Sequence, residues 1–270
     1  MLYYKKYVLS VYMLLLRGKK EKTMIIKCPN CGNDLGAPKA GVYRCSCCGK
    51  RMTEDDLGPS KKSVAASSGG SGADVFEKNK NGILEITCRF PGCASAGSGL
   101  LIDRSGYCIT NTHVVTNNSK ACNDITVKIA GENIRARIIA LGDDRGGHGN
   151  GVDLAMIKLD RLPANAKVIE LGDFDKVRIG ESVYVVGNSL GYGTCITSGI
   201  VSDKRRNVNG HMLMMTDCAV NGGNSGGPIF NAKGVAIGVI VSGITEAEGM
   251  NFAIPMDTVQ DFISRCGRYR

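Results

Sequence analysis

The stretch AVNGGNSGGPIF, residues 219–230, places one serine among four glycines directly before an apolar run. Glycines at this spacing let the backbone form a tight turn and approach a reacting group closely. Ser225 is therefore a candidate nucleophile rather than part of a flexible loop. The backbone N–H groups of Gly223 and Ser225 would converge on a developing oxyanion, with Asn224 as a further contributor.

A serine hydroxyl needs a base within hydrogen-bond reach and a group that orients this base. His148 and His211 fall in predicted loops, whereas His113 lies where the strand-like run of GYCITNTHVV enters a turn. Asp153 lies where a polar loop gives way to the apolar segment LAMIKL. A carboxylate there is costly unless an imidazole N–H or nearby backbone amides pair with it. We therefore predict that His113, Asp153 and Ser225 form one catalytic group.

The fold around these residues is predicted to be all-β. Runs rich in Val, Ile and Thr recur between Gly, Asn and Asp turns from residue 83 to residue 255, and helical periodicity is rare there. A short helix is expected at MDTVQDFISRC near the C-terminus. The chain of 270 residues is long enough for one or two domains with a real core.

The formal charge of +9 first suggests a nucleic-acid partner. However, residues 76–270 carry 21 basic and 19 acidic side chains, so the main domain is nearly balanced. The basic run Lys204-Arg205-Arg206 is interpreted as a solvated hairpin turn. A general electrostatic case for nucleic acid is therefore weak.

Two copies of the pattern Cys-x-x-Cys-Gly lie close together near the N-terminus. Two such turns facing each other would make a tetrahedral four-sulfur site for zinc, which predicts a zinc ribbon with a structural metal. Disulfides or unpaired thiols are the alternatives. Cys47 lies inside the second pattern and could replace a ligand there. The predicted ligands are Cys28, Cys31, Cys45 and Cys48.

The apolar run YVLSVYMLLL, residues 7–16, is too short to span a bilayer, which takes about 20 residues. The following RGKKEKT lacks the small residues of a signal cleavage site. Translation from Met24 is the favoured interpretation, and a short membrane anchor is its rival. The expected divisions are an N-terminal segment, a zinc ribbon, a Ser- and Gly-rich flexible linker and the main domain, at residues 1–23, 24–55, 56–75 and 76–270.

The segments GSGLLIDRSGYCITNTHVV, VDLAMIKL, VVGNSLGYGTCITSGIVS, NGGNSGGPIFN and EGMNFAIP resemble consecutive signatures of the HtrA/Deg-like branch of trypsin-like serine proteases. The resemblance covers roughly residues 80–265. It implies two antiparallel six-stranded β-barrels with the active site between them. His113 and Asp153 would come from the first barrel and Ser225 from the second.

The resemblance also implies a serine endopeptidase that cleaves unfolded or specific proteins and assembles as a trimer. The position that corresponds to the base of the specificity pocket is Ala219, which favours a small or medium aliphatic residue before the cleaved bond. The substrate backbone would pair with a strand containing Ile240, Val241 and Ser242. Gly222 stands where the family usually has proline, which removes a backbone constraint. No PDZ domain is expected before Arg270.

Two other functions fit the same residues less well. The protease fold could serve as a catalytically silent binding or regulatory module, or the zinc ribbon could direct a protease to nucleic acid. No cofactor is expected for catalysis itself. The chain has 12 cysteines, and a zinc site with scattered reduced thiols favours a reducing compartment. A cytoplasmic location is therefore expected, with membrane association through residues 7–16 as the alternative.

Overall fold

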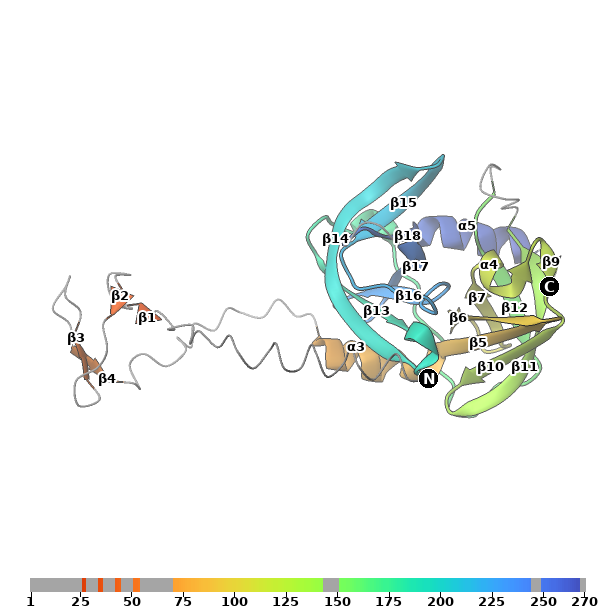
Figure 1. Cartoon of the computed structure of the whole chain (residues 1–270), viewed down its shortest axis with the longest axis horizontal. Coiled ribbons are helices and arrows are strands. Elements are labelled where there is room, and N and C mark those ends of the chain that lie inside the picture. The colour runs from red at the N-terminus through yellow and green to blue at the C-terminus, as the bar shows by residue number, and fades with distance from the viewer. Residues whose placement is uncertain are drawn as a thin grey trace, which may run out of the picture. The chain divides into compact units, whose positions relative to one another are not determined.

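The computed structural model describes residues 26–27, 34–35, 42–44, 51–53, 70–142, 151–243 and 249–267. The chain divides into two compact units, Met1–Ala66 and Ser67–Arg270. In the described parts of the first unit, four short strands form two antiparallel hairpins (Figure 1). These are β1 (Ile26–Lys27) with β2 (Asp34–Leu35), and β3 (Val42–Arg44) with β4 (Arg51–Thr53). The predicted zinc ligands lie outside the described residues.

The second unit begins with helix α3 (Gly72–Asn79), followed by the short helix η1 (Lys80–Gly82). Ser71 and Asp74 form a reciprocal capping box at the start of α3. The predicted flexible linker, residues 56–75, therefore extends too far, because its last residues belong to this helix. The capping box uses the same small polar residues that are typical of linkers.

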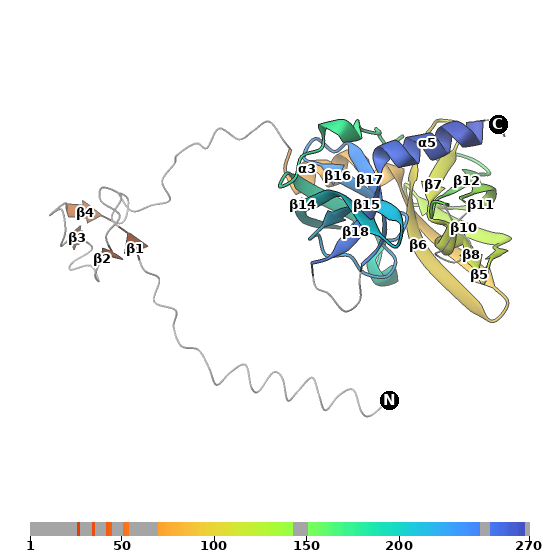
Figure 2. The ribbon, with the colours of Figure 1, turned by 90° about the horizontal axis from the view of Figure 1, so that it is seen from above.

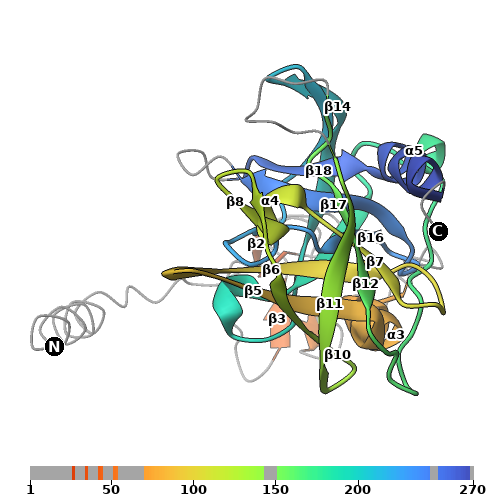
Figure 3. The same ribbon diagram turned by 90° about the vertical axis from the view of Figure 1, so that its right-hand side faces the viewer.

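Six antiparallel strands of the second unit close into a first barrel, in the spatial order β10-β11-β12-β7-β6-β5 (Figure 3). Burial alternates along β10, as expected for a barrel strand with one face in the core. The strands are β5 (Ile83–Phe90), β6 (Cys93–Leu101), β7 (Tyr107–Thr110), β10 (Asp124–Ile129), β11 (Glu132–Leu141) and β12 (Ala155–Leu159). Helix α4 (Thr112–Val115) and the hairpin β8 (Thr116–Asn117) with β9 (Lys120–Ala121) follow β7.

A second closed barrel has the order β13-β14-β15-β18-β17-β16 and lies beside the first (Figure 2). The predicted pair of six-stranded barrels is therefore present. Its strands are β13 (Ser182–Gly187), β14 (Cys195–Val208), β15 (His211–Thr216), β16 (Pro228–Asn231), β17 (Ala236–Gly243) and β18 (Asn251–Pro255). The short helices η2 (Phe174–Lys176) and η3 (Ser189–Gly191) flank β13. The predicted terminal helix is α5 (Met256–Cys266).

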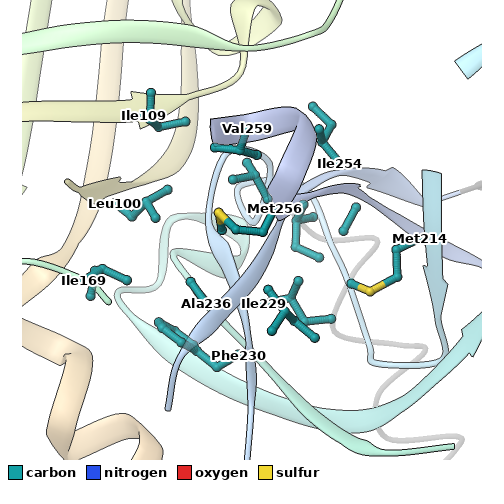
Figure 4. Packing of buried hydrophobic residues seen from close by; sticks show 14 of the residues in the cluster. Leu100, Ile109, Ile169, Met214, Ile229, Phe230, Ala236, Ile254, Met256 and Val259 are labelled. Atoms are coloured by element: carbon teal, nitrogen blue, oxygen red, sulfur yellow. The ribbon is translucent and has the colours of Figure 1, made fainter. Parts of the chain in front are cut away.

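One apolar cluster joins the two barrels and α5. Leu100 and Ile109 of the first barrel belong to the same buried cluster as Phe230 of the second barrel and Met256 of α5 (Figure 4). All four side chains are fully buried. Burying a side chain of this size contributes about 1.5–3 kcal/mol. The contact between the barrels is thus stabilised like a domain core, which fixes the relative position of residues on either side.

Among the described residues, no helix is long and apolar enough to cross a membrane. The apolar run at residues 7–16 lies outside them.

Candidate active site

Asp153 holds both the side chain and the backbone of His113. Its Oδ2 lies 2.5 Å from His113 Nδ1, and its Oδ1 accepts the His113 backbone N–H at 3.0 Å. His113 lies in the single turn of α4, whereas Asp153 precedes β12, and the side chain of Asp153 is 12% exposed. A carboxylate in this position fixes the imidazole tautomer and stabilises the imidazolium. The predicted pairing of these two residues is present.

The serine turn packs against the first barrel with little space between their backbones. The Ser98 N–H donates to the Ser225 carbonyl at 2.8 Å. A Cβ atom on Gly226, which has a φ of +84°, would overlap the Ser98 carbonyl and lie 3.0 Å from the backbone nitrogen of Asn111. Asn111 is the N-cap of α4, which carries His113. The structure therefore brings Ser225 and His113 to the same junction between the barrels.

The Ser225 hydroxyl donates to the Val241 carbonyl at 2.9 Å. Val241 lies at an irregularity in the pairing of β17 with β18, between the pairs Ile240↔Ala253 and Ser242↔Phe252. Among the described residues no direct hydrogen bond joins Ser225 to His113. Rotation of one side-chain torsion would redirect the hydroxyl, and catalytic hydrogen bonds commonly tighten only with substrate bound.

The backbone N–H groups of Gly223 and Ser225 are available for an oxyanion. The Leu190 N–H donates to the Gly222 carbonyl at 2.7 Å. Because C=O and N–H point to opposite sides of a trans peptide, this bond turns the Gly223 N–H away from Leu190. In the described part of the chain, no carbonyl or side chain accepts the N–H of Gly223 or Ser225. Gly223 has a φ of +95°, a conformation that favours glycine.

The contribution predicted for Asn224 is wrong. Its backbone N–H already donates to the Asn221 carbonyl at 3.1 Å, and the residue is only 1% exposed. The turn therefore uses the Asn224 N–H for an internal hydrogen bond and buries this residue.

The residues predicted to line the substrate pocket lie in different environments. Ala219 is exposed, and its carbonyl accepts the Thr197 hydroxyl at 2.8 Å. The side chain of Ile240 is fully buried in the core, so it cannot contact substrate. Along Val241, Ser242 and Gly243, β17 pairs only with β18 among the described residues. This edge beside Ser225 can accept an extended peptide.

Several cysteines of the second unit are buried, unreactive thiols. Burial raises the pKa of the Cys108 and Cys218 thiols. Burial and the neighbouring Cys122 together raise the pKa of Cys88 to about 12. Since the thiolate is the reactive form, these side chains stay protonated and inert near neutral pH.

A family model described as a trypsin-like peptidase domain matches residues 97–239, just over half of the chain. The chain therefore belongs to the trypsin-like peptidase family. A probable periplasmic serine endoprotease DegP-like of Pseudomonas putida is 35% identical over 174 residues, which cover 62% of this chain and 34% of the relative. A protein of the same description from Rickettsia prowazekii is 35% identical over 207 residues, covering 72% of this chain and 38% of the relative. The chain thus spans about a third of these relatives.

Solved structures of similar proteins agree with the fold. The serine endoprotease from Yersinia pestis has a TM-score of 0.63 and 26% identity, over 73% of this chain and 67% of that one. The HtrA-type protease AlgW with a tripeptide has a TM-score of 0.64 and 27% identity, over 72% of this chain and 62% of that one. A second family model, a domain of unknown function (DUF8512), matches residues 25–58.

The expected cytoplasmic location is contradicted, because the relatives are named periplasmic endoproteases. The expectation depended partly on the many unpaired cysteines. Burial raises the pKa of the Cys88, Cys108 and Cys218 thiols, so these three do not by themselves require a reducing compartment.

Proposed function

We propose that this chain is a serine endopeptidase that acts through an acyl-enzyme. The observation that carries the proposal is the contact of Asp153 with His113, at the junction where the Ser225 turn presents two amides that have no acceptor among the described residues. The relatives named as serine endoproteases add support, although the match to this chain covers only 34% and 38% of their length. A base, its orienting acid and an oxyanion site are the parts that acyl transfer needs.

In the first half of the reaction, Ser225 Oγ attacks the peptide carbonyl while His113 Nε2 takes the hydroxyl proton. The N–H groups of Gly223 and Ser225 stabilise the negative oxygen of the tetrahedral intermediate. His113 then donates the proton to the leaving amine, the C–N bond breaks, and an ester to Ser225 remains. Water attacks this ester with His113 again as base, which releases the acid and restores the serine hydroxyl.

The substrates in this proposal are protein or peptide chains that lie extended along Val241–Gly243. Exposed Ala219 offers no charge to a basic side chain, which supports a small or medium aliphatic residue before the cleaved bond. Labelling with a fluorophosphonate probe, together with cleavage of denatured casein, tests the activity. A folded chain that neither labels nor cleaves casein would support the silent regulatory module instead, for which the hydrogen bond from Ser225 to Val241 is the favouring observation.

We also propose that the N-terminal unit is a zinc ribbon. Each predicted Cys pair falls between the two strands of one hairpin, as a pair of metal-binding turns requires. A unit this small has little core, so the metal would supply much of its folding free energy.

We expect the purified full-length chain to carry one zinc ion, measured by elemental analysis. Cys28→Ser and Cys45→Ser should each lose the metal, because three thiolates hold zinc less tightly than four. Cys93→Ser removes an exposed free thiol of the second unit, and this variant should retain the zinc ion. Full zinc occupancy in both ligand variants would contradict the proposed ligands.

Assembly into a trimer, which the resemblance implies, is part of the proposal. We expect light scattering of the full chain to give three times the mass of the monomer. A monomer at every concentration would contradict it.

A further inference from the structure

Ser98 occupies the middle of β6 and is fully buried where the first barrel meets the serine turn. Its hydroxyl donates to the Gly223 carbonyl at 2.7 Å and accepts the Asn188 N–H at 2.8 Å. We propose that Ser98 is a positioning residue that holds Gly223 so that its N–H points into the oxyanion site. The inference rests on the proposed function and assigns a further residue to the same reaction.

The backbone of Ser98 fixes its hydroxyl relative to the nucleophile. The Ser98 N–H donates to the Ser225 carbonyl at 2.8 Å, and the Ser98 carbonyl accepts the Thr110 hydroxyl at 2.7 Å. One residue of the first barrel thus bonds to the nucleophile and to one of the two oxyanion donors. The separation between those two positions is thereby set from outside the turn.

A hydrogen bond to its carbonyl holds each of the two peptide groups that flank Gly223. The Gly222 carbonyl is held by the Leu190 N–H, and the Gly223 carbonyl by the Ser98 hydroxyl. Leu190 lies in η3, and Asn188 is the N-cap residue of that helix. Ser98 therefore bridges the two segments whose contact determines the direction of the Gly223 N–H.

Loss of the Ser98 hydroxyl would leave two buried groups without partners, the Gly223 carbonyl and the Asn188 N–H. A buried unpaired polar group is unfavourable, so the turn would move to find another partner. Movement of Gly223 displaces the Gly223 N–H from the oxyanion, whereas the edge of β17 that pairs with substrate is unchanged. The loss should therefore appear in kcat rather than in KM.

The glycines around Ser98 leave little room for further side chains at this contact. A Cβ atom on Gly97 would lie 2.6 Å from Val114 Cγ2, and one on Gly99 would lie 2.8 Å from the Ile109 carbonyl. A Cβ atom on Gly187 would approach the Ser98 hydroxyl itself to 2.8 Å. The motif GSG, residues 97–99, thus places one hydroxyl between two positions where a Cβ atom would clash.

The test compares Ser98→Ala with the wild-type full chain and with Asn79→Ala. Asn79 is also buried, and it donates two hydrogen bonds, to Val75 and Gly234, in α3 away from the serine turn. We expect Ser98→Ala to lower the second-order rate of fluorophosphonate labelling and the kcat for casein about 10- to 100-fold, somewhat less than removal of an oxyanion donor. KM should stay unchanged, and Asn79→Ala should lower only the melting temperature.

Labelling of Ser98→Ala at the wild-type rate, with the wild type active, would overturn the role of Ser98 and leave the proposed function intact. A wild type that does not label would overturn both. Should Ser98→Ala fail to fold, Ser98→Cys keeps a side chain of similar size with a weaker donor, and its labelling rate should still fall. A rate that falls equally in Asn79→Ala would show that Ser98 acts only through stability.

Discussion

Ser225→Ala is expected to abolish fluorophosphonate labelling and to lower kcat for peptide-bond cleavage by about 10⁶-fold. The reason is that the hydroxyl is the attacking group in the proposed mechanism, and no other described side chain occupies its place in the turn. The turn itself should persist, because its backbone is fixed by the bond from the Ser98 N–H and by the packing of Gly226. Labelling is measured by in-gel fluorescence, and cleavage with denatured casein.

Ser105→Ala is the matched control. Ser105 is exposed in the turn between β6 and β7, and its replacement should leave labelling at the wild-type level. Equal labelling of wild type and Ser225→Ala, with label recovered on another residue, would show that the nucleophile is assigned wrongly.

Asp153→Asn is expected to lower kcat by about 10⁴-fold, as in a well-studied triad of the same type. The Asp153 carboxylate accepts hydrogen bonds from the His113 ring and backbone at 2.5 and 3.0 Å. An amide of the same shape can donate to Nδ1 instead. The imidazole then carries its proton on Nε2 and cannot accept the proton of Ser225. The change is measured as initial rates of casein cleavage under saturating substrate.

Asp124→Asn serves for comparison, because the Asp124 side chain forms an exposed ion pair with Arg89, at 3.9 Å. Such pairs contribute about 0–1 kcal/mol, so activity should be retained. A kcat for Asp153→Asn within tenfold of the wild-type value would remove the orienting role from Asp153.

The fold was predictable from the sequence where residue pattern and burial coincide. The runs rich in Val, Ile and Thr between turn residues predicted the barrel strands, and the helix predicted at MDTVQDFISRC is α5. The run Lys204-Arg205-Arg206 was wrongly assigned to a turn, since it lies within β14. Arg206 pairs with Asp203 there, and the Lys204 and Arg205 cations lie over the Phe174 ring, at 5.4 and 5.1 Å. The hairpin turns instead at Asn209 and Gly210, both with positive φ.

The site was predictable where the type of side chain determines the chemistry. His113 and Asp153 were predicted as partners because a carboxylate at the start of an apolar strand is costly unless a group such as an imidazole N–H pairs with it. Asn224 and Ile240 were misjudged because a sequence does not show which way a side chain or an N–H points. Ser98 was missed for a related reason. Its importance comes from two backbone groups, Gly223 C=O and Asn188 N–H, that any residues would supply.

The close packing of Gly97 and Gly226 has a consequence for building chimeras from this protein and a homologue. A Cβ atom on Gly97 would lie 3.1 Å from the Ser225 carbonyl, and one on Gly226 would overlap the Ser98 carbonyl. At these two glycines the first barrel and the serine turn therefore approach each other backbone to backbone. A chimera that exchanged one half for that of a homologue would keep its geometry only if the donor also carried glycine at the matching position.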